Sequence, residues 1–461
     1  MSRLVVVSNR VTKTRQGHAQ AGGLAVGLVG ALKEMDGLWF GWSGKVTENP
    51  SDDPELSTNN DIAYATVDLS PGEYDQYYNG FSNAMLWPLF HYRLDLMDFH
   101  REYYQAYRRT NARFAKILAG LLKPDDLIWV HDYHLIPLAE ELRRLGVRNP
   151  MGFFLHTPFP SHQVMVVLPQ HREIVSALGA YDVVGFQSSI DLRTFSHYIK
   201  FETRGVFQED KHLIRAFRRT FYADKFPIGI DTENVEAMAK SPDNAARIER
   251  LTESMRGRSL VIGVDRLDYS KGLAQRFHAF ETFLVRHRDW RGKVVMLQIA
   301  PGTREGVAQY EEIRHELETE AGRINGAHSA FDWVPIRYLN RSFARETLAA
   351  FFRQARVGLV TPLRDGMNLV AKEYVAAQDP SNPGVLILSR FAGAAEQLVD
   401  ALIVNPYDED RVASTLGRAL EMPLKERQAR WDSTMNVIRR HDIDSWRRRF
   451  LAVLARAPFS L

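Results

Sequence analysis

Cysteine is absent from this 461-residue chain, and its absence excludes disulfide frameworks, thiolate nucleophiles and zinc sites built on cysteine. The chain also lacks the run of ~18 apolar residues that a helix needs to cross a bilayer. Its first apolar run, Leu4 to Val7, has four residues and is too short for the hydrophobic region of a secretory signal. We therefore expect a cytoplasmic protein without a membrane partner.

A strong excess of charge is missing as well. The chain has 59 Lys and Arg against 56 Asp and Glu, a net charge of +3, and no long basic block of the kind that marks a nucleic-acid surface. The densest basic clusters, Arg439 to His441 and Arg447 to Arg449, lie in a region with a helical pattern. We interpret them as solvated helix faces, so no nucleic-acid partner is expected.

The length of the chain predicts two domains, because a single core rarely grows beyond roughly 250–300 residues. Short β-branched runs alternate with helical patterns such as 99–122 and 138–145, the rhythm of parallel βαβ units. The predicted class is therefore α/β, with two Rossmann-like doubly wound domains. The expected strands are 4–7, 38–40, 127–130, 152–155 and 183–186 in the first half, and 260–264, 294–299, 357–360, 385–388 and 402–404 in the second.

The break between the domains is predicted near Pro227 to Asp231, where a proline and a glycine precede a polar helical pattern. We place the first domain at residues 1–235 and the second at 236–440. The polar, turn-rich stretch 49–60 is predicted to be a surface loop.

Polar residues follow the apolar runs, at the carboxyl ends of the strands where open parallel sheets bind ligands. Cations and carboxylates occur there in both halves, so we expect two sheets that face each other across a cleft with one shared site. The segments are Ser8 to Arg10, His131 to His134, His156 to Pro158, Asp265 to Gly272, Pro301 to Arg304 and Thr361 to Gly366.

Two features suit a phosphorylated ligand. Gly22 and Gly23 precede an apolar helical pattern, where glycines let backbone N–H groups approach an anion, although a plain turn explains such a pair equally well. Arg266 and Lys271 lie five residues apart around a turn after a strand. A diphosphate needs about two such cations, so the repetition of charge in both halves favours the ligand interpretation.

Three other patterns have competing interpretations. His131 and His134 are poor evidence for zinc, because the loop pair lacks a cysteine or a clear third ligand. Asp408 to Asp410 resembles the acidic metal triplet of some glycosyltransferases, but it opens a helical pattern, where acids cap. An aromatic cluster either belongs to the core or lines a sugar pocket; its members are Tyr77, Tyr78, Trp87 and Tyr92.

The ordered motifs together resemble the trehalose-6-phosphate synthase family in its bacterial form. The resemblance extends from Ser8 to the C-terminal helical region, and its most specific block is Arg364-Asp365-Gly366-Met367-Asn368-Leu369-Val370-Ala371-Lys372-Glu373-Tyr374. It implies the two-lobed GT-B fold, with a final helix at about 441–461 that packs back onto the first domain. The other blocks are Ala21 to Leu24, Trp39 to Gly44, Tyr77 to Asn79, Leu86 to Pro88, His131 to His134 and Arg266 to Gly272.

The resemblance also assigns roles to matching residues. In the acceptor site it implies Arg10, Tyr78, Trp87, Asp132 and Arg304, with Arg10, Tyr78 and Arg304 on the sugar phosphate. In the donor site it implies Arg266 and Lys271 on the diphosphate, with Gly22 and Gly23 in the loop over it. The donated glucose would contact Asp365, Gly366, Met367, Asn368 and His156. Leu369, Val370 and Glu373 would lie at the diphosphate and ribose, and Phe343 beside the base. The residues expected to take part in catalysis are Arg266, Lys271, Asp132, His156 and Asp365.

The implied reaction transfers glucose, with retention, from a nucleotide sugar, UDP-glucose by family expectation, to glucose 6-phosphate. A retaining transfer uses either a carboxylate nucleophile or an internal return, in which the leaving phosphate oxygen takes the acceptor proton. The second route needs cations more than a protein base, so we expect no covalent nucleophile. The resemblance further implies no cofactor, no metal, and a homo-oligomer, a dimer or tetramer.

One departure and three rivals qualify this interpretation. Gln163 stands where the family commonly has glutamate, which leaves details of the acceptor loop open. A related synthase with another phosphorylated acceptor, such as glycerol 3-phosphate, would keep most of these blocks. A catalytically inactive sensor of sugar phosphates is disfavoured by the intact Arg266, Lys271, Asp365 and Glu373, and a Rossmann dehydrogenase by the lack of Gly-x-Gly-x-x-Gly after the first strand.

Overall fold

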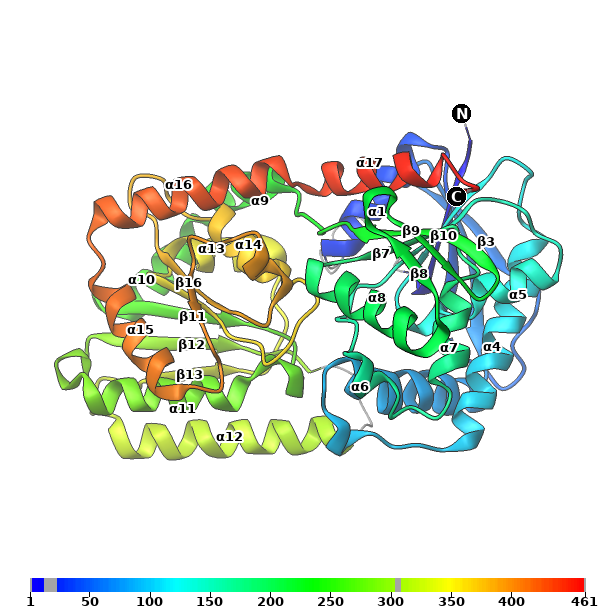
Figure 1. The fold of residues 1–461 in the computed structure, drawn as a ribbon. Coiled ribbons are helices and arrows are strands. Elements are labelled where there is room, and N and C mark those ends of the chain that lie inside the picture. Colours follow the sequence, from blue (N-terminus) through cyan, green and yellow to red (C-terminus); the bar gives the residue numbers. More distant parts are fainter. Residues whose placement is uncertain (1, 12–22, 303–307, 460–461) are drawn as a thin grey trace. The chain divides into compact units, whose positions relative to one another are not determined.

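The computed structural model describes residues 2–11, 23–302 and 308–459 and consists of two compact units, each with its own β-sheet (Figure 1). The first unit comprises the described residues up to 228 together with 444–459, and the second comprises 229–302 and 308–443. None of the described helices is long and apolar enough to cross a membrane.

The first unit contains a sheet with the order β3-β4-β2-β1-β5-β6-β7-β10-β9-β8. Parallel pairing joins the seven strands from β4 to β10 in this order. At the two edges, β3 and the β9-β8 pair are added in antiparallel orientation. Leaving out β3, the first six strands follow the Rossmann order 3-2-1-4-5-6. The strands are β1 (Leu4–Arg10), β2 (Leu38–Val46), β3 (Glu55–Asn59), β4 (Ile62–Leu69), β5 (Leu127–His131), β6 (Met151–Phe154), β7 (Val183–Phe186), β8 (Val206–Gln208), β9 (Leu213–Ala216) and β10 (Arg219–Lys225).

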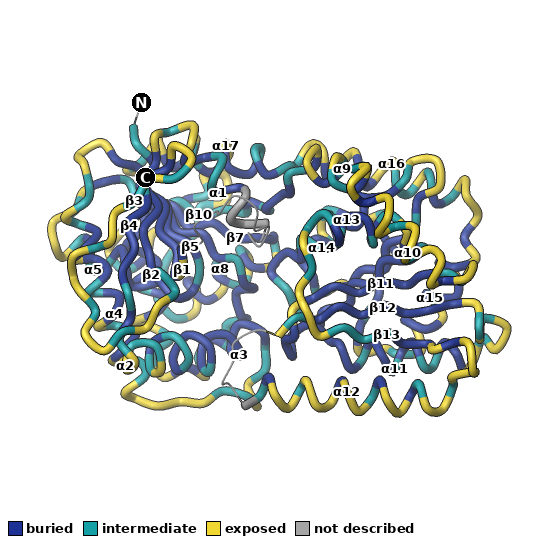
Figure 2. The backbone as a smooth tube through the Cα atoms, turned by 180° about the vertical axis from the view of Figure 1, so that it is seen from behind, coloured by how far each residue is buried: buried dark blue, intermediate teal, exposed yellow. Residues whose placement is uncertain are grey.

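The second unit repeats the same order in a wholly parallel sheet, β13-β12-β11-β14-β15-β16. The four central strands, β11, β12, β14 and β15, are buried apolar runs because helices cover both faces of such a sheet, as the dark blue colour of β11 and β12 in Figure 2 illustrates. The predicted α/β class with two Rossmann-like sheets is therefore confirmed. The strands are β11 (Ser259–Val264), β12 (Val294–Ile299), β13 (Ile336–Leu339), β14 (Val357–Val360), β15 (Val385–Ser389) and β16 (Leu402–Val404).

The surface-loop prediction for residues 49–60 is wrong in part. Residues 55–59 form β3, which pairs antiparallel with β4 at the edge of the sheet. An edge strand with both faces largely exposed needs no apolar alternation, so its polar sequence resembles a loop. The expected strands also leave out β4, β8, β9, β10 and β13. Like β3, β13 lies at a sheet edge, and it is only partly buried, whereas β4 is a largely buried parallel strand.

Helices connect the strands in both units. The predicted helices at 99–122 and 138–145 are present as α4 and α5. In the first unit the helices are α1 (Gly23–Glu34), α2 (Pro71–Glu73), the π-helical η1 (Tyr74–Leu86), α3 (Trp87–Phe90), η2 (Leu94–Leu96), α4 (Arg101–Ala119), η3 (Tyr133–Leu135), α5 (Leu138–Arg144), α6 (His162–Met165), α7 (His171–Leu178), α8 (Ser189–Thr203), η4 (Glu209–Lys211) and α17 (Ile443–Leu454). In the second they are α9 (Thr232–Lys240), η5 (Pro242–Asn244), α10 (Ala245–Met255), η6 (Tyr269–Lys271), α11 (Leu273–Arg286), η7 (Arg288–Trp290), α12 (Ala308–His328), α13 (Arg345–Gln354), α14 (Leu369–Ala376), η8 (Gly393–Glu396), α15 (Glu409–Glu421) and α16 (Leu424–Arg440).

Helix α17, the last element of the chain, packs against the sheet of the first unit. The rings of Trp446 and Phe450 lie 4.8 Å and 4.7 Å from the ring of Trp129 in β5. Gly152 in β6 makes room for this contact, since a Cβ there would lie 2.6 Å from Phe450. The helix thus covers one face of β5 and β6.

The solvated-face prediction for the basic clusters holds at Arg440, Arg448 and Arg449, which are exposed, and is wrong at Arg447. The Arg447 side chain is only 5% exposed and pairs with Glu34 of α1 at 2.6 Å. It fills the space beside Gly30 of the same helix. The sequence alone suggests a solvated face, because it does not show that Arg447 packs against Glu34, a residue more than 400 positions earlier in the chain.

Candidate active site

Three strands of the first unit end side by side, and the predicted residues follow those ends. Arg10 is the last residue of β1, Asp132 follows the last residue of β5, and His156 lies two residues beyond β6. β1, β5 and β6 are neighbours in the sheet. The main-chain N–H of His156 donates to the Asp132 carboxylate at 3.3 Å, so parallel pairing brings these side chains to one edge, as predicted.

Asp132 has a strained backbone. Its φ of 76° and ψ of 164° fall in a region that is essentially reserved for glycine and costs on the order of 1–3 kcal/mol for other residues. Its N–H nevertheless donates to the Phe154 carbonyl at 2.9 Å, which fixes the turn. Strain of this kind persists mainly at functional sites, so the observation supports a role for this carboxylate.

Arg10 is joined to Tyr78 through an aromatic side chain. The Arg10 guanidinium carbon lies 5.7 Å from the centre of the Trp42 ring, and that ring lies 5.3 Å from the ring of Tyr78. Gly44 makes room for the arginine, because a Cβ there would lie 2.8 Å from its Nε. Tyr78 belongs to η1, and π-helical turns are frequent at functional sites.

The aromatic contacts continue to Trp87. Tyr78 stacks on His134 at 5.9 Å, His134 stacks on Tyr133 at 4.0 Å, and Tyr133 lies 5.7 Å from Trp87. Tyr133 and His134 directly follow Asp132 in η3. Ring contacts therefore connect Arg10, Tyr78 and Trp87 within the first unit, and Asp132 directly precedes Tyr133, a member of this chain of contacts.

The cluster of four aromatic residues divides between the two interpretations. Tyr77 is fully buried and donates through its hydroxyl to Asn9 at 2.6 Å, so it belongs to the core. Tyr78 and Tyr92 are half-buried, and the Tyr92 hydroxyl accepts from the Ser161 N–H at 2.8 Å. Their partial exposure is compatible with a sugar pocket, whereas Trp87 is buried.

A neutral histidine pair lies beneath these residues. The Nδ1 of His131 and the Nε2 of His156 are 3.1 Å apart, so they share one proton. Burial lowers the pKa of His156 to about 3. Burial and the neighbouring His156 hold the pKa of His131 well below its usual range. At neutral pH both rings are uncharged, and His156 acts as a polar group without a charge.

In the second unit, Lys271 and Asp365 form an ion pair. The Nζ of Lys271 lies 2.5 Å from Oδ2 of Asp365, and the two side chains are 10% and 14% exposed. The side-chain amide of Asn368 also donates to Oδ2, at 3.1 Å. Lys271 follows β11 and Asp365 follows β14, which are paired strands, so the sheet again brings the predicted residues together at its carboxyl ends.

The two loops that carry this pair are fastened to each other. Ser270 accepts through its carbonyl from the N–H of Leu363 at 2.8 Å. Gly272 has a φ of +63°, and a Cβ there would lie 2.7 Å from the Thr361 carbonyl oxygen. Only glycine permits both the conformation and the close approach. The position of Lys271 beside Asp365 is thus set by backbone contacts.

The loop after Asp365 is held from its other side. The N–H of Ala394 donates to the Met367 carbonyl at 2.9 Å, and Gly393 lies so close that a Cβ would be 1.9 Å from the Gly366 carbonyl oxygen. Asn368 caps α14 by accepting from the Ala371 N–H. Gly366 and Met367 are buried by this arrangement, whereas Leu369 and Val370 are half-buried on the first turn of α14.

Glu373 and Phe343 are connected through Arg345. A guanidinium nitrogen of Arg345 lies 3.7 Å from Oε1 of Glu373, and burial raises the pKa of that carboxyl. Phe343 lies two residues before Arg345, with the guanidinium of Arg341 4.7 Å from its ring centre. Arg266 is exposed. The Arg345–Glu373 pair therefore joins the segment that carries Phe343 to α14, which carries Glu373.

Two predicted residues, Gly22 and Arg304, lie outside the described residues, and Gly23 is the first residue of α1. Gln163, where the family commonly has glutamate, is exposed on α6. The sequence suggests no function for Arg345 or Trp42, and for His131 only a weak zinc interpretation. Trp42 lies within the block Trp39 to Gly44 and His131 within the block His131 to His134, but nothing in the sequence shows that Arg345 reaches Glu373, 28 residues further on.

The competing metal interpretations find no support. His134 stacks between two tyrosines, and His131 pairs with His156. No group of three or more His, Cys, Asp or Glu side chains among the described residues is placed to hold a metal ion. The capping prediction for Asp408 is confirmed, since its carboxylate accepts from the Arg411 N–H at 2.9 Å at the start of α15.

Both units carry a sheet in the Rossmann order, with cations and carboxylates at the carboxyl ends of the strands, where open parallel sheets bind ligands. The chain belongs to glycosyltransferase family 20, whose model matches residues 2–456. A curated relative from Klebsiella pneumoniae subsp. pneumoniae, called trehalose-6-phosphate synthase, is 50% identical over 451 residues, which cover 98% of this chain and 94% of the relative.

Solved structures agree with this assignment. An α,α-trehalose-phosphate synthase (UDP-forming) from Burkholderia xenovorans, in complex with glucose-6-phosphate, is 50% identical with a TM-score of 0.94, and the match covers 98% of this chain and 100% of that one. A structure from E. coli bound with UDP-2-fluoro glucose is 47% identical with a TM-score of 0.94, over 99% and 100% of the chains. The expected enzyme family and fold class are confirmed.

Proposed function

We propose that this enzyme transfers glucose from UDP-glucose to glucose 6-phosphate with retention, which gives α,α-trehalose 6-phosphate and UDP. The similar Burkholderia xenovorans protein binds glucose-6-phosphate, and the similar E. coli protein binds UDP-2-fluoro glucose. Both share about half of their residues with this chain. The observation that carries the proposal for this chain is the buried pairing of Lys271 with Asp365.

The first unit would bind the acceptor. Arg10 lies over Trp42 and close to Tyr78, so a guanidinium and a phenol face the same region, which suits a phosphate group. Arg304, assigned by resemblance alone, would add a second cation. Trp87 and Asp132 would contact the sugar, Asp132 by accepting from its hydroxyl groups.

The second unit would bind the donor. Lys271 and the exposed Arg266 would neutralise the diphosphate, with Gly22 and Gly23 in the loop that covers it. Glu373, which pairs with Arg345, would accept hydrogen bonds from ribose hydroxyls, and Phe343 would lie beside the base. The glucose would contact Asp365, His156 and the backbone from Gly366 to Asn368, and the diphosphate end would contact Leu369 and Val370.

The reaction would proceed by internal return. The bond between glucose C1 and the diphosphate oxygen breaks, that oxygen accepts the proton of the attacking acceptor hydroxyl, and the new glycosidic bond forms on the same face. Arg266 and Lys271 would stabilise the developing charge on the diphosphate. The Asp365 carboxylate is already ion-paired with Lys271 and accepts a hydrogen bond from Asn368, which makes it a poor nucleophile and supports this route.

His156 fits this scheme as an uncharged group. With a pKa of about 3 it is a weak base at neutral pH, so it would orient the donated glucose by hydrogen bonding while the phosphate oxygen takes the proton. No second protein base is needed. His131 would hold the His156 ring through their shared proton.

Four expectations about domain organisation, assembly, cofactors and location complete the proposal. We propose domain borders at 1–235 and 236–440, with the segment at about 441–461 returning to the first domain, and a homo-oligomer, either a dimer or a tetramer. The reaction would need no metal and no cofactor. The cytoplasmic location stays a prediction from the sequence.

The test is a matrix of purified enzyme with UDP-, ADP- and GDP-glucose against glucose 6-phosphate and glycerol 3-phosphate, with products identified by mass spectrometry and anomeric configuration by NMR. We expect trehalose 6-phosphate with both anomeric centres α, and the highest kcat/KM with UDP-glucose and glucose 6-phosphate. Preference for glycerol 3-phosphate would overturn the acceptor assignment, and an inverted centre would overturn the mechanism.

A further inference from the structure

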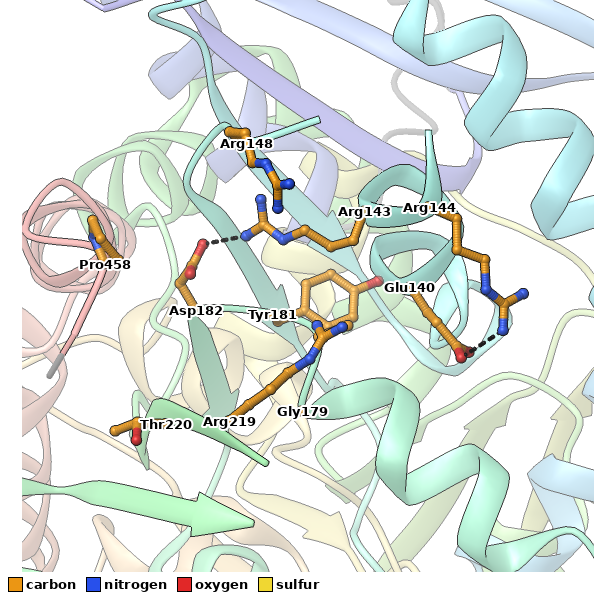
Figure 3. Close-up of a pocket in the computed structure, with 11 residues that line it drawn as sticks. Glu140, Arg143, Arg144, Arg148, Gly179, Tyr181, Asp182, Arg219, Thr220 and Pro458 are labelled. Atoms are coloured by element: carbon orange, nitrogen blue, oxygen red, sulfur yellow. Dashed lines mark hydrogen bonds and ion pairs between the residues drawn. The ribbon is translucent and has the colours of Figure 1, made fainter. Parts of the chain in front are cut away.

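A polar pocket lies in the first unit, and none of its lining residues belongs to the proposed acceptor site. Its volume is about 710 Å³, within the ~300–1,000 Å³ typical of small-molecule sites. Its walls come from the end of α5 and the loop after it, from the residues before β7, and from the start of β10 (Figure 3). All lining residues belong to the first unit.

Four arginines and two carboxylates line this pocket, which leaves the lining with a net positive charge. Arg143 pairs with Asp182 at 2.8 Å, and Arg144 pairs with Glu140 at 2.8 Å. The two carboxylates are therefore both occupied. Figure 3 shows the guanidinium groups of Arg143, Arg148 and Arg219 directed toward the same hollow.

The remaining two arginines, Arg148 and Arg219, are exposed and form no ion pair with any residue in the described part of the chain. Burial lowers the pKa of Arg143, the Asp182 carboxylate opposes this shift, and the positive charges of Arg219 and Arg148 add to it. Three positive charges thus converge on a single carboxylate, Asp182, which already pairs with Arg143. A bound anion would relieve this repulsion and accept from the free guanidinium groups.

The pocket lies at the amino ends of the strands, whereas the proposed active-site residues of this unit lie at the carboxyl ends. Asp182 precedes β7 and Arg219 begins β10, whereas Asp132 and His156 follow the ends of β5 and β6. Parallel strands keep these two ends apart by the strand length, roughly 15 Å at ~3.3 Å per residue. The Tyr181 side chain closes the bottom of the pocket, with its hydroxyl donating to the Leu135 carbonyl at 2.8 Å.

We propose that this pocket binds a small phosphorylated anion, a phosphate monoester or diphosphate, at a site separate from the catalytic centre. Arg148 and Arg219 grip the phosphate oxygens, since the planar guanidinium fork matches phosphate geometry. Arg143 contributes the third positive charge while it remains paired with Asp182. The site is independent of the proposed reaction, because none of its residues belongs to the donor or acceptor set.

The test is isothermal titration of the full chain with inorganic pyrophosphate and, separately, with citrate as a trivalent anion without phosphorus. The double variant Arg148→Ala/Arg219→Ala removes the two unpaired cations. The control is Lys200→Ala/Lys211→Ala, which removes two exposed cations of the same unit that do not line the pocket. Binding at the donor site is common to all three proteins and cancels in the comparison.

We expect one pyrophosphate site of the wild type to weaken by about tenfold or more in the arginine variant and to persist in the lysine control. Pyrophosphate should also protect Arg148 and Arg219 from phenylglyoxal, as mapped by peptide mass spectrometry. Equal isotherms for the wild type and the arginine variant would overturn the proposal. Citrate binding as tight as pyrophosphate would overturn the phosphate assignment, and a change of oligomeric state in the arginine variant without loss of a site would show a subunit interface.

Discussion

The ammonium group of Lys271 and the carboxylate of Asp365, 94 residues apart, lie 2.5 Å from each other. The pair is mostly shielded from water, so each charge depends on the other. Lys271 has three N–H groups and can keep Asp365 while it donates to a diphosphate oxygen. In the proposed donor site, the Lys271 ammonium group is therefore held in place by Asp365 before the diphosphate binds.

Removal of Lys271 should lower the rate strongly. For Lys271→Ala we expect kcat/KM to fall by about 10²–10³-fold, roughly 3–4 kcal/mol, because the developing diphosphate charge loses a preorganised cation. Steady-state kinetics with UDP-glucose measures it. Lys293→Ala, which removes an exposed lysine of the same unit, should retain wild-type kinetics. A Lys271→Ala enzyme within twofold of wild type would contradict the role.

Addition of one methyl group at Gly393 should displace the donor loop. Its Cβ would lie 1.9 Å from the Gly366 carbonyl oxygen, so Gly393→Ala must move the Asp365 to Met367 segment. We expect at least about a tenfold loss of kcat/KM, since small misplacements of positioning groups are costly. Gly326→Ala is the control, because nothing lies near that position in α12. It should keep full activity and gain up to ~1 kcal/mol of helix stability.

Arg10 should matter only for phosphorylated acceptors. For Arg10→Ala we expect the KM for glucose 6-phosphate to rise by about 10–100-fold with a smaller change in kcat, because a charge-assisted hydrogen bond to phosphate is lost. Glucose itself, which lacks the phosphate, should be used equally poorly by the variant and the wild type. A similar loss with both acceptors would instead indicate a structural role.

The histidine pair should make the protein less stable in acid. The pKa of His156 is about 3 when folded and 6.5 when unfolded, so only the unfolded state takes up its proton as the pH falls between these values. Stability should decrease below pH 6.5, at most by ~1.4 kcal/mol per pH unit for this group. Urea unfolding at pH 7.5, 6.5 and 5.5 measures the slope, and His156→Gln should reduce it by one proton. An unchanged slope would contradict the buried, neutral histidine.

No sugar should become attached to a carboxylate. Incubation with 2-fluoro-substituted UDP-glucose, followed by intact-protein and peptide mass spectrometry, should show only the unmodified chain, because Asp365 is ion-paired with Lys271 and hydrogen-bonded by Asn368. A glycosyl adduct on Asp365 or Asp132 would replace the internal return with a double displacement.

Most of the buried parallel strands and the residues that follow them could be predicted from the sequence, because apolar runs and turn residues are local signals. β4 is an exception, since small and polar residues interrupt its buried run. β3 could not be predicted either, since its pattern at the sheet edge resembles that of a loop. The strained backbone of Asp132 left no mark in the sequence, because aspartate is an unusual residue for that conformation. The Arg345–Glu373 pair and the burial of Arg447 depend on packing between distant segments, which no local pattern records.

Helix α17 covers β5 and β6 with Trp446 and Phe450, although these strands are made more than 280 residues earlier in the chain. The ribosome must therefore synthesise α17 before this hydrophobic surface can be shielded. During synthesis the exposed patch is a natural target for chaperones. A nonsense mutation within α17 would damage a sheet whose strands lie far upstream in the sequence.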